Sequence, residues 1–291
     1  MNLTQFNLAL VEIREDRTHG ASELARRCLL ILAEAARAEP AGSVVELQKR
    51  LSALSAELAQ TRPSMAPVQN LLRRWREALT FAEEADLATA RRMAVERAEV
   101  LIAASRQAVL DCAVRVADLL GCGRTVMTHS LSSTVVEVCR LLGGQGLRMI
   151  ITESRPLMEG RRLAEQLSIW GTPTTFITDA QMGLFVAEAD AVLVGADSVL
   201  ADGAVVNKAG TGLLALAARD RGVPFYVCCE SFKWRAPGQP PPELEEMAPA
   251  ELETPDWPGV TVRNVYFDLT PGRLVSAWID ETGVRWPETG P

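Results

Sequence analysis

The second half of the chain alternates short β-prone runs with helix-like segments, and this alternation restricts the possible folds more than any other feature. The predicted strands cover 125–127, 148–152, 174–177, 191–194 and 224–228, and the helix-like segments between them cover 132–142, 160–170, 180–188 and 212–221. Strands that alternate with helices of about ten residues form βαβ units around a parallel sheet. We therefore predict a doubly wound α/β domain with its site at the carboxyl ends of the strands.

The chain before this region has a helical pattern. Apolar residues recur every three or four positions among Ala, Leu, Arg and Glu, which predicts helices over 21–38, 43–60 and 68–113. Prolines mark the breaks at 40–42 and 62–67. The predicted organisation is a helical N-terminal domain, 1–115, followed by the α/β domain, 116–291.

The end of the α/β domain is less regular. Residues 236–253 are rich in Pro and Glu, which is typical of an exposed loop. The runs 261–268 and 273–279 predict one or two final strands.

Charge and hydropathy argue against two classes of partner. The net charge of −7 argues against a nucleic-acid groove as the main surface, although a local basic pocket could hold a phosphate. No run approaches the roughly 20 apolar residues that cross a bilayer, so no membrane association is expected. Because the first residues lack the parts of a secretory signal, the expected compartment is cytoplasmic.

The cysteines and histidines indicate no metal or disulfide framework. The six cysteines include no CxxC pair and mostly lie in apolar surroundings, which favours reduced, buried thiols. The two histidines and the dispersed carboxylates form no cluster with metal-ligand spacing. We expect neither a structural metal nor a cofactor.

Several polar clusters directly follow predicted strands. They are Thr128–Thr134, Glu153–Arg155, Asp179, Gly195–Asp197 and Glu230–Lys233. Since a parallel sheet brings the carboxyl ends of its strands to one edge, these clusters are expected to converge there. Their coincidence is more informative than any one of them.

Three groups near this edge allow both a structural and a functional interpretation. The turn Ser132–Thr134 is a good helix N-cap, and its hydroxyls and amides can also hold a phosphate. Asp197 is a solvated loop carboxylate or, if recessed, a proton donor with a raised pKa. Lys208 is a surface lysine or, since Asn207 and glycines flank it, part of a tight loop aimed at a ligand; the P-loop spacing is absent.

Ser130 raises the question of a hydrolytic nucleophile. The GxSxG elbow is missing, and the adjacent His129 points to the opposite face of an extended chain. A serine triad is therefore not supported, and a buried, hydrogen-bonded His129 is the commoner outcome.

Several short motifs spread over nearly the whole chain carry a resemblance to a known superfamily. They are GASELARR from Gly20, RPS from Arg62, TESRPLMEGRRLA, DAQMG, VGADSVLADGAVVNKAGT, ESFKW and NVYFDLTPG. In this order they resemble the superfamily that joins ribose 1,5-bisphosphate isomerase, methylthioribose 1-phosphate isomerase and the alpha, beta and delta regulatory subunits of the eukaryotic translation initiation factor two-B complex. The GAD–NKAGT block, with ESFK at matching distance, is the most specific part.

The resemblance implies a helical N-terminal domain on a Rossmann-like C-terminal domain, with a pocket between them for a phosphorylated sugar. It also implies homodimers or larger homo-oligomers. In the isomerases the aspartate of GAD is the proton donor, which falls on Asp197. The other implied substrate contacts are Gly20, Ala21, Ser22, Arg62, Ser132, Ser133, Thr134, Asn207, Lys208 and Lys233.

Two positions depart from the isomerase pattern. The isomerases carry a cysteine as catalytic base directly after the Thr-His of the strand end, where this chain has Ser130, and an arginine before the first glycine, where it has His19. A thiol supplies some thiolate at neutral pH, whereas a serine hydroxyl supplies essentially none. Without a partner base Ser130 cannot replace the cysteine, and the candidates for another base are Asp197, His19 and His129.

The sequence leaves two functions open, of which we favour the first. The first is an aldose–ketose isomerase, an intramolecular oxidoreductase, in which Asp197 moves the proton and the lysines, Arg62 and the Ser132–Thr134 turn hold the phosphates. The second is a non-catalytic protein that binds a sugar phosphate or nucleotide, or joins an assembly like the initiation-factor subunits. An unrelated hydrolase or dehydrogenase has little support, because the best glycine pair, 121 and 123, precedes a strand.

Overall fold

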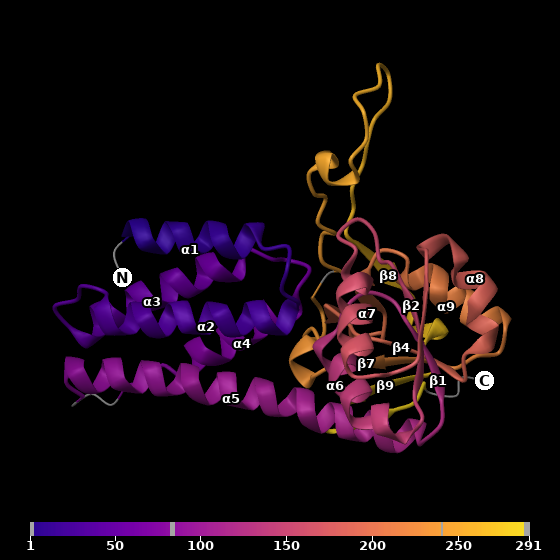
Figure 1. Ribbon diagram of the computed structural model, residues 1–291. Coiled ribbons are helices and arrows are strands. Elements are labelled where there is room, and N and C mark those ends of the chain that lie inside the picture. Colours follow the sequence, from indigo (N-terminus) through magenta and orange to yellow (C-terminus); the bar gives the residue numbers. More distant parts are fainter. Residues whose placement is uncertain (1–2, 82–84, 240, 288–291) are drawn as a thin grey trace. The chain divides into compact units, whose positions relative to one another are not determined.

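The computed structural model describes residues 3–81, 85–239 and 241–287 (Figure 1). The chain divides into two compact units, Met1–Gln107 (unit 1) and Ala108–Pro291 (unit 2). This division falls inside one long helix, α5 (Leu87–Leu120), as does the sequence-based boundary after residue 115. Within the described residues, no helix is both long and apolar enough to cross a membrane.

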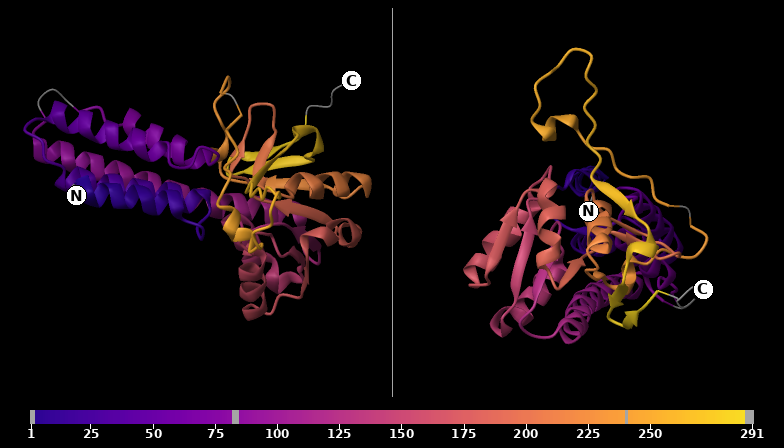
Figure 2. Two further views of the ribbon diagram at one scale, coloured as in Figure 1. Left: turned by 90° about the horizontal axis from the view of Figure 1, so that it is seen from above. Right: turned by 90° about the vertical axis from the view of Figure 1, so that its right-hand side faces the viewer.

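Unit 1 is a bundle of helices (Figure 2). In it α2 packs against α1, α3 and α4. The buried face of α2 carries Leu24, Cys28 and Leu32, which are fully buried and follow the predicted helical spacing. The helices are α1 (Leu3–Glu15), α2 (Ala21–Ala38), α3 (Val44–Ala59), α4 (Ala66–Glu77) and the first part of α5.

The structure confirms the predicted helices at 21–38 and 43–60 but not a single helix over 68–113. Instead α4 ends at Glu77 and α5 begins at Leu87; residues 82–84 of that prediction lie outside the described residues. Asp86 explains the new start, because its Oδ1 accepts a hydrogen bond from the Thr89 N–H at 2.7 Å. This is an N-cap contact, which favours a helix beginning directly after Asp86.

Unit 2 is built on a seven-stranded sheet in the order β10-β9-β7-β4-β1-β2-β3. Neighbouring strands are parallel except β9 and β10, which are antiparallel. All five predicted strands are confirmed, as β1, β2, β3, β4 and β7. The strands are β1 (Thr125–Thr128), β2 (Arg148–Thr152), β3 (Thr174–Ile177), β4 (Ala191–Val194), β7 (Phe225–Cys228), β9 (Ala277–Asp280) and β10 (Gly283–Arg285).

Helices cover both faces of this sheet, which confirms the doubly wound α/β prediction (Figure 1). One apolar layer contains the end of α5, α6 (Ser133–Leu142) and α7 (Glu159–Ile169), and Val126 points into it. The other contains α8 (Met182–Phe185) and α9 (Thr211–Asp220), and Met127 points into it. The predicted helix at 180–188 is only the single turn α8 between the 3₁₀ turns η2 (Asp179–Gln181) and η3 (Val186–Glu188).

A second, antiparallel sheet of three strands, β5-β6-β8, corrects the predicted loop around Lys208. Asn207 and Lys208 end strand β6, and Asn207 is paired with Asp268 of β8. The hairpin between β5 and β6 turns at Gly203, whose φ of 79° suits glycine. The strands are β5 (Ser198–Val199), β6 (Val205–Lys208) and β8 (Phe267–Thr270).

The residues 236–266 form an arm that projects from unit 2 between β7 and β8 (Figure 1). Its described residues are mostly exposed or half-exposed, as predicted for 236–253; residue 240 lies outside the described residues. The arm contains the 3₁₀ turn η5 (Pro249–Leu252) and a β-bridge between Glu246 and Val265.

The six cysteines of the chain form no disulfide, and all but the exposed Cys122 are buried. The remaining 3₁₀ turns are η1 (Gly143–Gln145), η4 (Ser231–Lys233) and η6 (Gly272–Leu274).

Candidate functional site

The strand order places the topological switch point of the large sheet between β1 and β4. These strands are parallel neighbours, but the chain continues from β1 to β2 and β3 on one side and from β4 to β7 and β9 on the other. Ligands of open α/β sheets bind at the carboxyl ends of two such strands. Ser130 follows β1 and Asp197 follows β4, so the two residues predicted to be catalytic flank this point.

The loops after β1 and β4 touch each other. Gly195 leaves no room for a side chain, because an added Cβ would lie 2.5 Å from the Oγ of Ser132. Ser132 is the N-cap of α6, and Thr134 in the first turn of that helix has a buried Oγ1 without a hydrogen-bond partner among the described residues. The turn Ser132–Thr134 therefore lies next to the loop that carries Asp197, and the positive end of α6 points to the same place.

Ser130 has an unusual backbone conformation. Its φ is 71° and that of Ser154, after β2, is 61°, a region that non-glycine residues rarely adopt. The Ser130 N–H donates to Ser154 Oγ at 2.8 Å. The Asp179 carboxylate in turn accepts hydrogen bonds from the N–H groups of Ser154 and Arg155, both at 2.8 Å. Three strand ends thus hold Ser130 in place, as is common for residues at functional sites.

Both ring nitrogens of the buried His129 take part in hydrogen bonds, as expected from the sequence. His129 is 2% exposed. Its Nε2 lies 2.9 Å from the Ala209 carbonyl and must donate, so its Nδ1 accepts from the Thr152 hydroxyl at 2.6 Å. Burial lowers the pKa of His129, against the opposing effect of the Ala209 carbonyl. The ring is therefore neutral at pH 7 and has no free nitrogen to act as a base for Ser130.

Lys233 is a buried cation at the end of β7, beside β4. It is 5% exposed, and its Nζ lies 3.4 Å from Oε2 of Glu230, which is 1% exposed. Burial alone would lower the pKa of Lys233, but the carboxylates of Glu230 and Asp197 outweigh it and raise that pKa. Lys233 therefore stays protonated, and Asp197 lies within range of its charge.

Lys208 forms a second buried ion pair, which the sequence analysis missed. Its Nζ lies 2.7 Å from Oε1 of Glu159, the first residue of α7, and 4.4 Å from the ring centre of Tyr266. Asn207, on the opposite face of β6, donates to the Thr211 hydroxyl at 3.1 Å. The charge of Lys208 acts on His129, which places it near the end of β1.

Asp268 is a further residue of this edge that the sequence analysis did not assign. Its Oδ2 accepts hydrogen bonds from the N–H groups of Gly210 and Gly212, at 2.8 and 3.0 Å. Burial raises the pKa of Asp268, although these two amides act in the other direction. Asp268 thereby fixes the turn that follows Lys208. The motif NVYFDLTPG contained it, but only the pairing of β6 with β8 shows which turn it holds.

The residues predicted in unit 1 lie at the start of α2 and, in the case of Arg62, against Asp16. Gly20 is the N-cap of α2, and Ser22 in its first turn is buried with no partner for its Oγ among the described residues. Arg62, 3% exposed, donates from its Nη1 to the Asp16 carbonyl at 2.9 Å. Burial would raise the pKa of Asp16, but hydrogen bonds from His19 and Thr18 lower it to about 2. Ala21 is buried in the same first turn.

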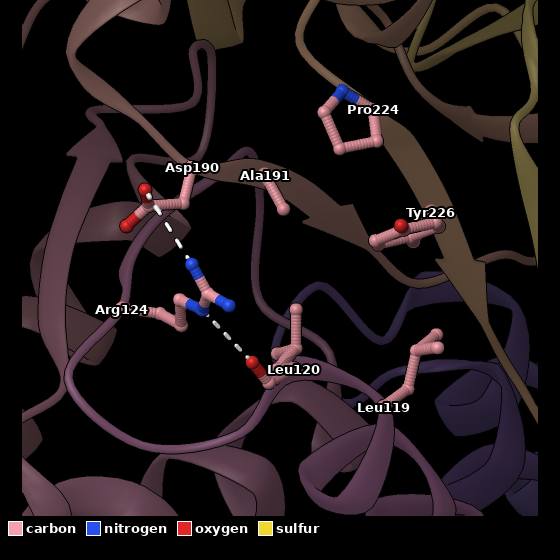
Figure 3. Close-up of a pocket in the computed structure, with 7 residues that line it drawn as sticks. All are labelled: Leu119, Leu120, Arg124, Asp190, Ala191, Pro224 and Tyr226. Atoms are coloured by element: carbon pink, nitrogen blue, oxygen red, sulfur yellow. Dashed lines mark hydrogen bonds and ion pairs between the residues drawn. The ribbon is translucent and has the colours of Figure 1, made fainter.

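A cavity of about 160 Å³ lies at the opposite edge of the large sheet (Figure 3). It is lined by residues at the amino ends of β1, β4 and β7, among them Ala191 and Pro224. The Nε of Arg124 donates to the Leu120 carbonyl at 3.0 Å, and its Nη1 lies 3.9 Å from Asp190. None of the predicted site residues lines this cavity.

Across the described residues, no group of three or more His, Cys, Asp and Glu side chains could hold a metal ion.

Two solved structures are similar to this chain over nearly its whole length. The crystal structure of the Pyrococcus horikoshii OT3 translation initiation factor eIF-2B is similar over 98% of both chains, at 34% identity and a TM-score of 0.83. That of 5-methylthioribose 1-phosphate isomerase from the same organism is similar over 97% of this chain and 84% of its own, at 25% identity and a TM-score of 0.78.

A curated relative adds the second kind of isomerase. Ribose 1,5-bisphosphate isomerase from Pyrococcus furiosus is 32% identical over 288 residues, which covers 95% of this chain and 89% of the relative. The model of the initiation factor 2 subunit family matches residues 17–287. Since that match spans most of the sequence and includes every predicted site residue, the chain belongs to the initiation factor 2 subunit family.

Proposed function

We propose that this chain is a sugar-phosphate isomerase that binds its substrate at the switch point of the large sheet and interconverts aldose and ketose forms. The observation that carries the proposal is the juxtaposition of Asp197 with the buried cation Lys233 at the ends of β4 and β7. A carboxylate beside a permanent positive charge at such a position can exchange a proton with a bound sugar.

The proposed chemistry assigns one task to each group. Conversion of an aldose into a ketose requires a group that removes the proton from C2 and a group that gives a proton to the ring oxygen. Asp197 gives its proton to the ring oxygen as the ring opens and takes a proton back from the hydroxyl of C2, and Lys233 stabilises the negative charge that develops on the substrate. Ser130 stands at the position of the second group, which must remove the proton from C2 and return it to C1, and a cysteine in its place supplies that base. The turn Ser132–Thr134 holds the phosphate at the N-terminus of α6, and Asn207 and Lys208 contact the sugar. Roles for Gly20, Ala21, Ser22 and Arg62 rest on the resemblance to the isomerases.

A second candidate is a protein that binds the same ligand without converting it. Two observations favour it: Ser130 stands where the isomerases have a cysteine, and both nitrogens of its neighbour His129 are engaged. A serine hydroxyl needs a base to remove its proton. Under this candidate the edge of the sheet is a sensor for a sugar phosphate or nucleotide.

NMR spectroscopy of the protein incubated with ribose 1,5-bisphosphate or methylthioribose 1-phosphate tests the proposal. We expect ketose resonances with one of them, a faster reaction in Ser130→Cys, and none in Asp197→Asn. Thermal-shift measurements with the same ligands report binding separately. Stabilisation without ketose, in wild type and in Ser130→Cys, would favour the second candidate, and no stabilisation by any sugar phosphate or nucleotide would contradict both.

We also propose that the chain forms a homodimer or a larger homo-oligomer. The exposed apolar side chains of Leu213 and Leu216 on α9 support this, with 69% and 52% of their surface accessible. Light scattering coupled to gel filtration measures the mass directly, and a monomer at micromolar concentration would contradict the proposal.

A further inference from the structure

We infer that the Lys208 subsite is electrically neutral and takes a sugar hydroxyl, so that the ligand of this chain carries one phosphate rather than two. The inference rests on the proposed function and names the substrate class. Glu159 is the residue that determines this specificity, because it supplies the negative charge that neutralises Lys208.

The ion pair of Lys208 and Glu159 is close and shielded from solvent. The distance between Nζ and Oε1 is 2.7 Å, and the two side chains are 5% and 13% exposed. The charge of a buried pair is screened far less than that of a surface pair. A phosphate that approached Lys208 would therefore meet the Glu159 carboxylate at short range, and like charges in such a position repel strongly.

Glu159 has little freedom to withdraw. It begins α7, and the next residue, Gly160, is pressed against β2: an added Cβ would lie 1.8 Å from the Thr152 carbonyl oxygen. The N–H of Gly160 also donates to the Glu153 carbonyl at 3.2 Å. The backbone that carries Glu159 is thus fixed to the sheet.

Lys208 is held equally well. Its ammonium lies 4.4 Å from the ring centre of Tyr266 and 5.8 Å from that of Phe267. Its carbonyl accepts a hydrogen bond from the Thr211 hydroxyl at 2.6 Å. The pair is therefore a built feature of the edge and not a chance contact of two flexible side chains.

The unused hydrogen-bonding capacity of the carboxylates indicates which group would fit. Oε2 of Glu159 is buried and accepts no hydrogen bond within the described part of the chain, and the same holds for Oε1 of Glu230. An ionised carboxylate can only accept hydrogen bonds. A sugar hydroxyl can donate one, whereas an ionised phosphate presents chiefly acceptor oxygens. Both carboxylates therefore suit hydroxyls.

The charges around the switch point lead to the same conclusion. Lys208 and Lys233 face the carboxylates of Glu159, Glu230 and Asp197, so the lysines provide no excess positive charge for a second phosphate. In unit 2 the turn Ser132–Thr134 at the start of α6 remains as a place for one phosphate.

Isothermal titration calorimetry with ribose 1-phosphate, ribose 5-phosphate and ribose 1,5-bisphosphate tests the inference. We expect the better monophosphate to bind wild type at least about tenfold more tightly than the bisphosphate. Glu159→Gln should tighten bisphosphate binding by about tenfold or more and change monophosphate binding by less than about threefold. Glu165→Gln, an exposed glutamate on the same helix, is the matched control and should change neither.

The outcomes separate the inference from the proposed function. Bisphosphate binding to wild type as tight as that of the monophosphates overturns the inference and leaves the proposed function standing. A preference for monophosphates that persists unchanged in Glu159→Gln overturns the role of Glu159. If neither these three sugars nor methylthioribose 1-phosphate binds, the proposed function fails and the inference with it. Should Glu159→Gln not fold, the ratio measured on wild type still decides.

Discussion

Replacing Gly160 by alanine tests how firmly the start of α7, and with it Glu159, is fixed to the sheet. The Cβ of the alanine would lie 1.8 Å from the Thr152 carbonyl oxygen and 2.9 Å from its carbonyl carbon. Ordinary contact between such atoms needs a separation of at least about 3.2 Å, so α7 must move away from β2 by more than 1 Å or so. Because both atoms in the way belong to the backbone of β2, no side-chain rotation relieves the clash.

The size of the effect follows from two opposing contributions. Overpacking of a dense core costs about 1–3 kcal/mol and at times more, and this contact is severe enough for the upper end. Alanine in place of glycine in a helix returns up to about 1 kcal/mol. We therefore expect Gly160→Ala to lower the free energy of unfolding by at least about 2 kcal/mol. For a unit of this size that corresponds to a fall in Tm of about 4–8 °C.

Urea unfolding followed by circular dichroism measures the change. Gly183→Ala is the matched control: Gly183 also lies in a helix, and an added Cβ there meets nothing within 4 Å. The control should be neutral or slightly more stable. If Gly160→Ala unfolds at the same urea concentration as the control, α7 is not pressed against β2, and the argument that Glu159 cannot withdraw loses its basis.

Three further predictions concern charged and titrating groups. Lys233→Met leaves Glu230 buried without its cation and should lower the free energy of unfolding in urea by about 3–5 kcal/mol. Adding Glu230→Leu should recover most of this loss of stability. A Lys233→Met variant as stable as wild type would contradict the pairing of Lys233 with Glu230. Burial lowers the pKa of His129 below the unfolded value of 6.5, so its contribution to stability is complete above that pH and is lost below it, by up to about 1.4 kcal/mol per pH unit. Wild type should therefore lose more stability than His129→Gln between pH 7 and pH 5, and parallel profiles would argue against a buried neutral ring. Asp16→Asn should cost unit 1 about 1 kcal/mol at pH 7, since partial exposure screens its contacts. The pKa of Asp16 is lowered to about 2, so the difference from wild type should disappear as the pH falls from about 4 through 2; a difference that persists at pH 2 would count against this assignment.

The large sheet could be predicted from the sequence because each of its central strands is a short apolar run bounded by helical segments. β4, for example, is Ala191–Val194 and is buried on both faces. The small sheet escaped prediction because its first strand, β5, has only two residues, too few for an alternating or apolar pattern. Gly203 and Gly210, which flank β6, indicated a loop, whereas they serve the turns at its two ends. The end of α4 was missed because helix formers such as Arg76 and Glu77 continue the pattern up to the break.

The candidate site could be predicted only in part. The residues that follow strands, such as Ser130, Asp197 and Lys233, could be placed at one edge by the rule for parallel sheets. Their partners could not, because Glu159 meets Lys208 and Asp268 meets Gly210 through tertiary contacts between distant segments. The positive φ of Ser130 was equally hidden, since it depends on Ser154 and Asp179 rather than on a glycine.

The arm between β7 and β8 is anchored at both of its roots. At one end the Arg235 N–H donates to the Val199 carbonyl at 2.8 Å, and at the other the Ala209 N–H donates to the Tyr266 carbonyl at the same distance. Its outer part carries the exposed side chains of Trp257 and Val260. Because both roots are fixed in this way, we expect that the arm can be lengthened or shortened beside Trp257 without disturbing Lys233 or Lys208, so this position suits a dye or an affinity tag.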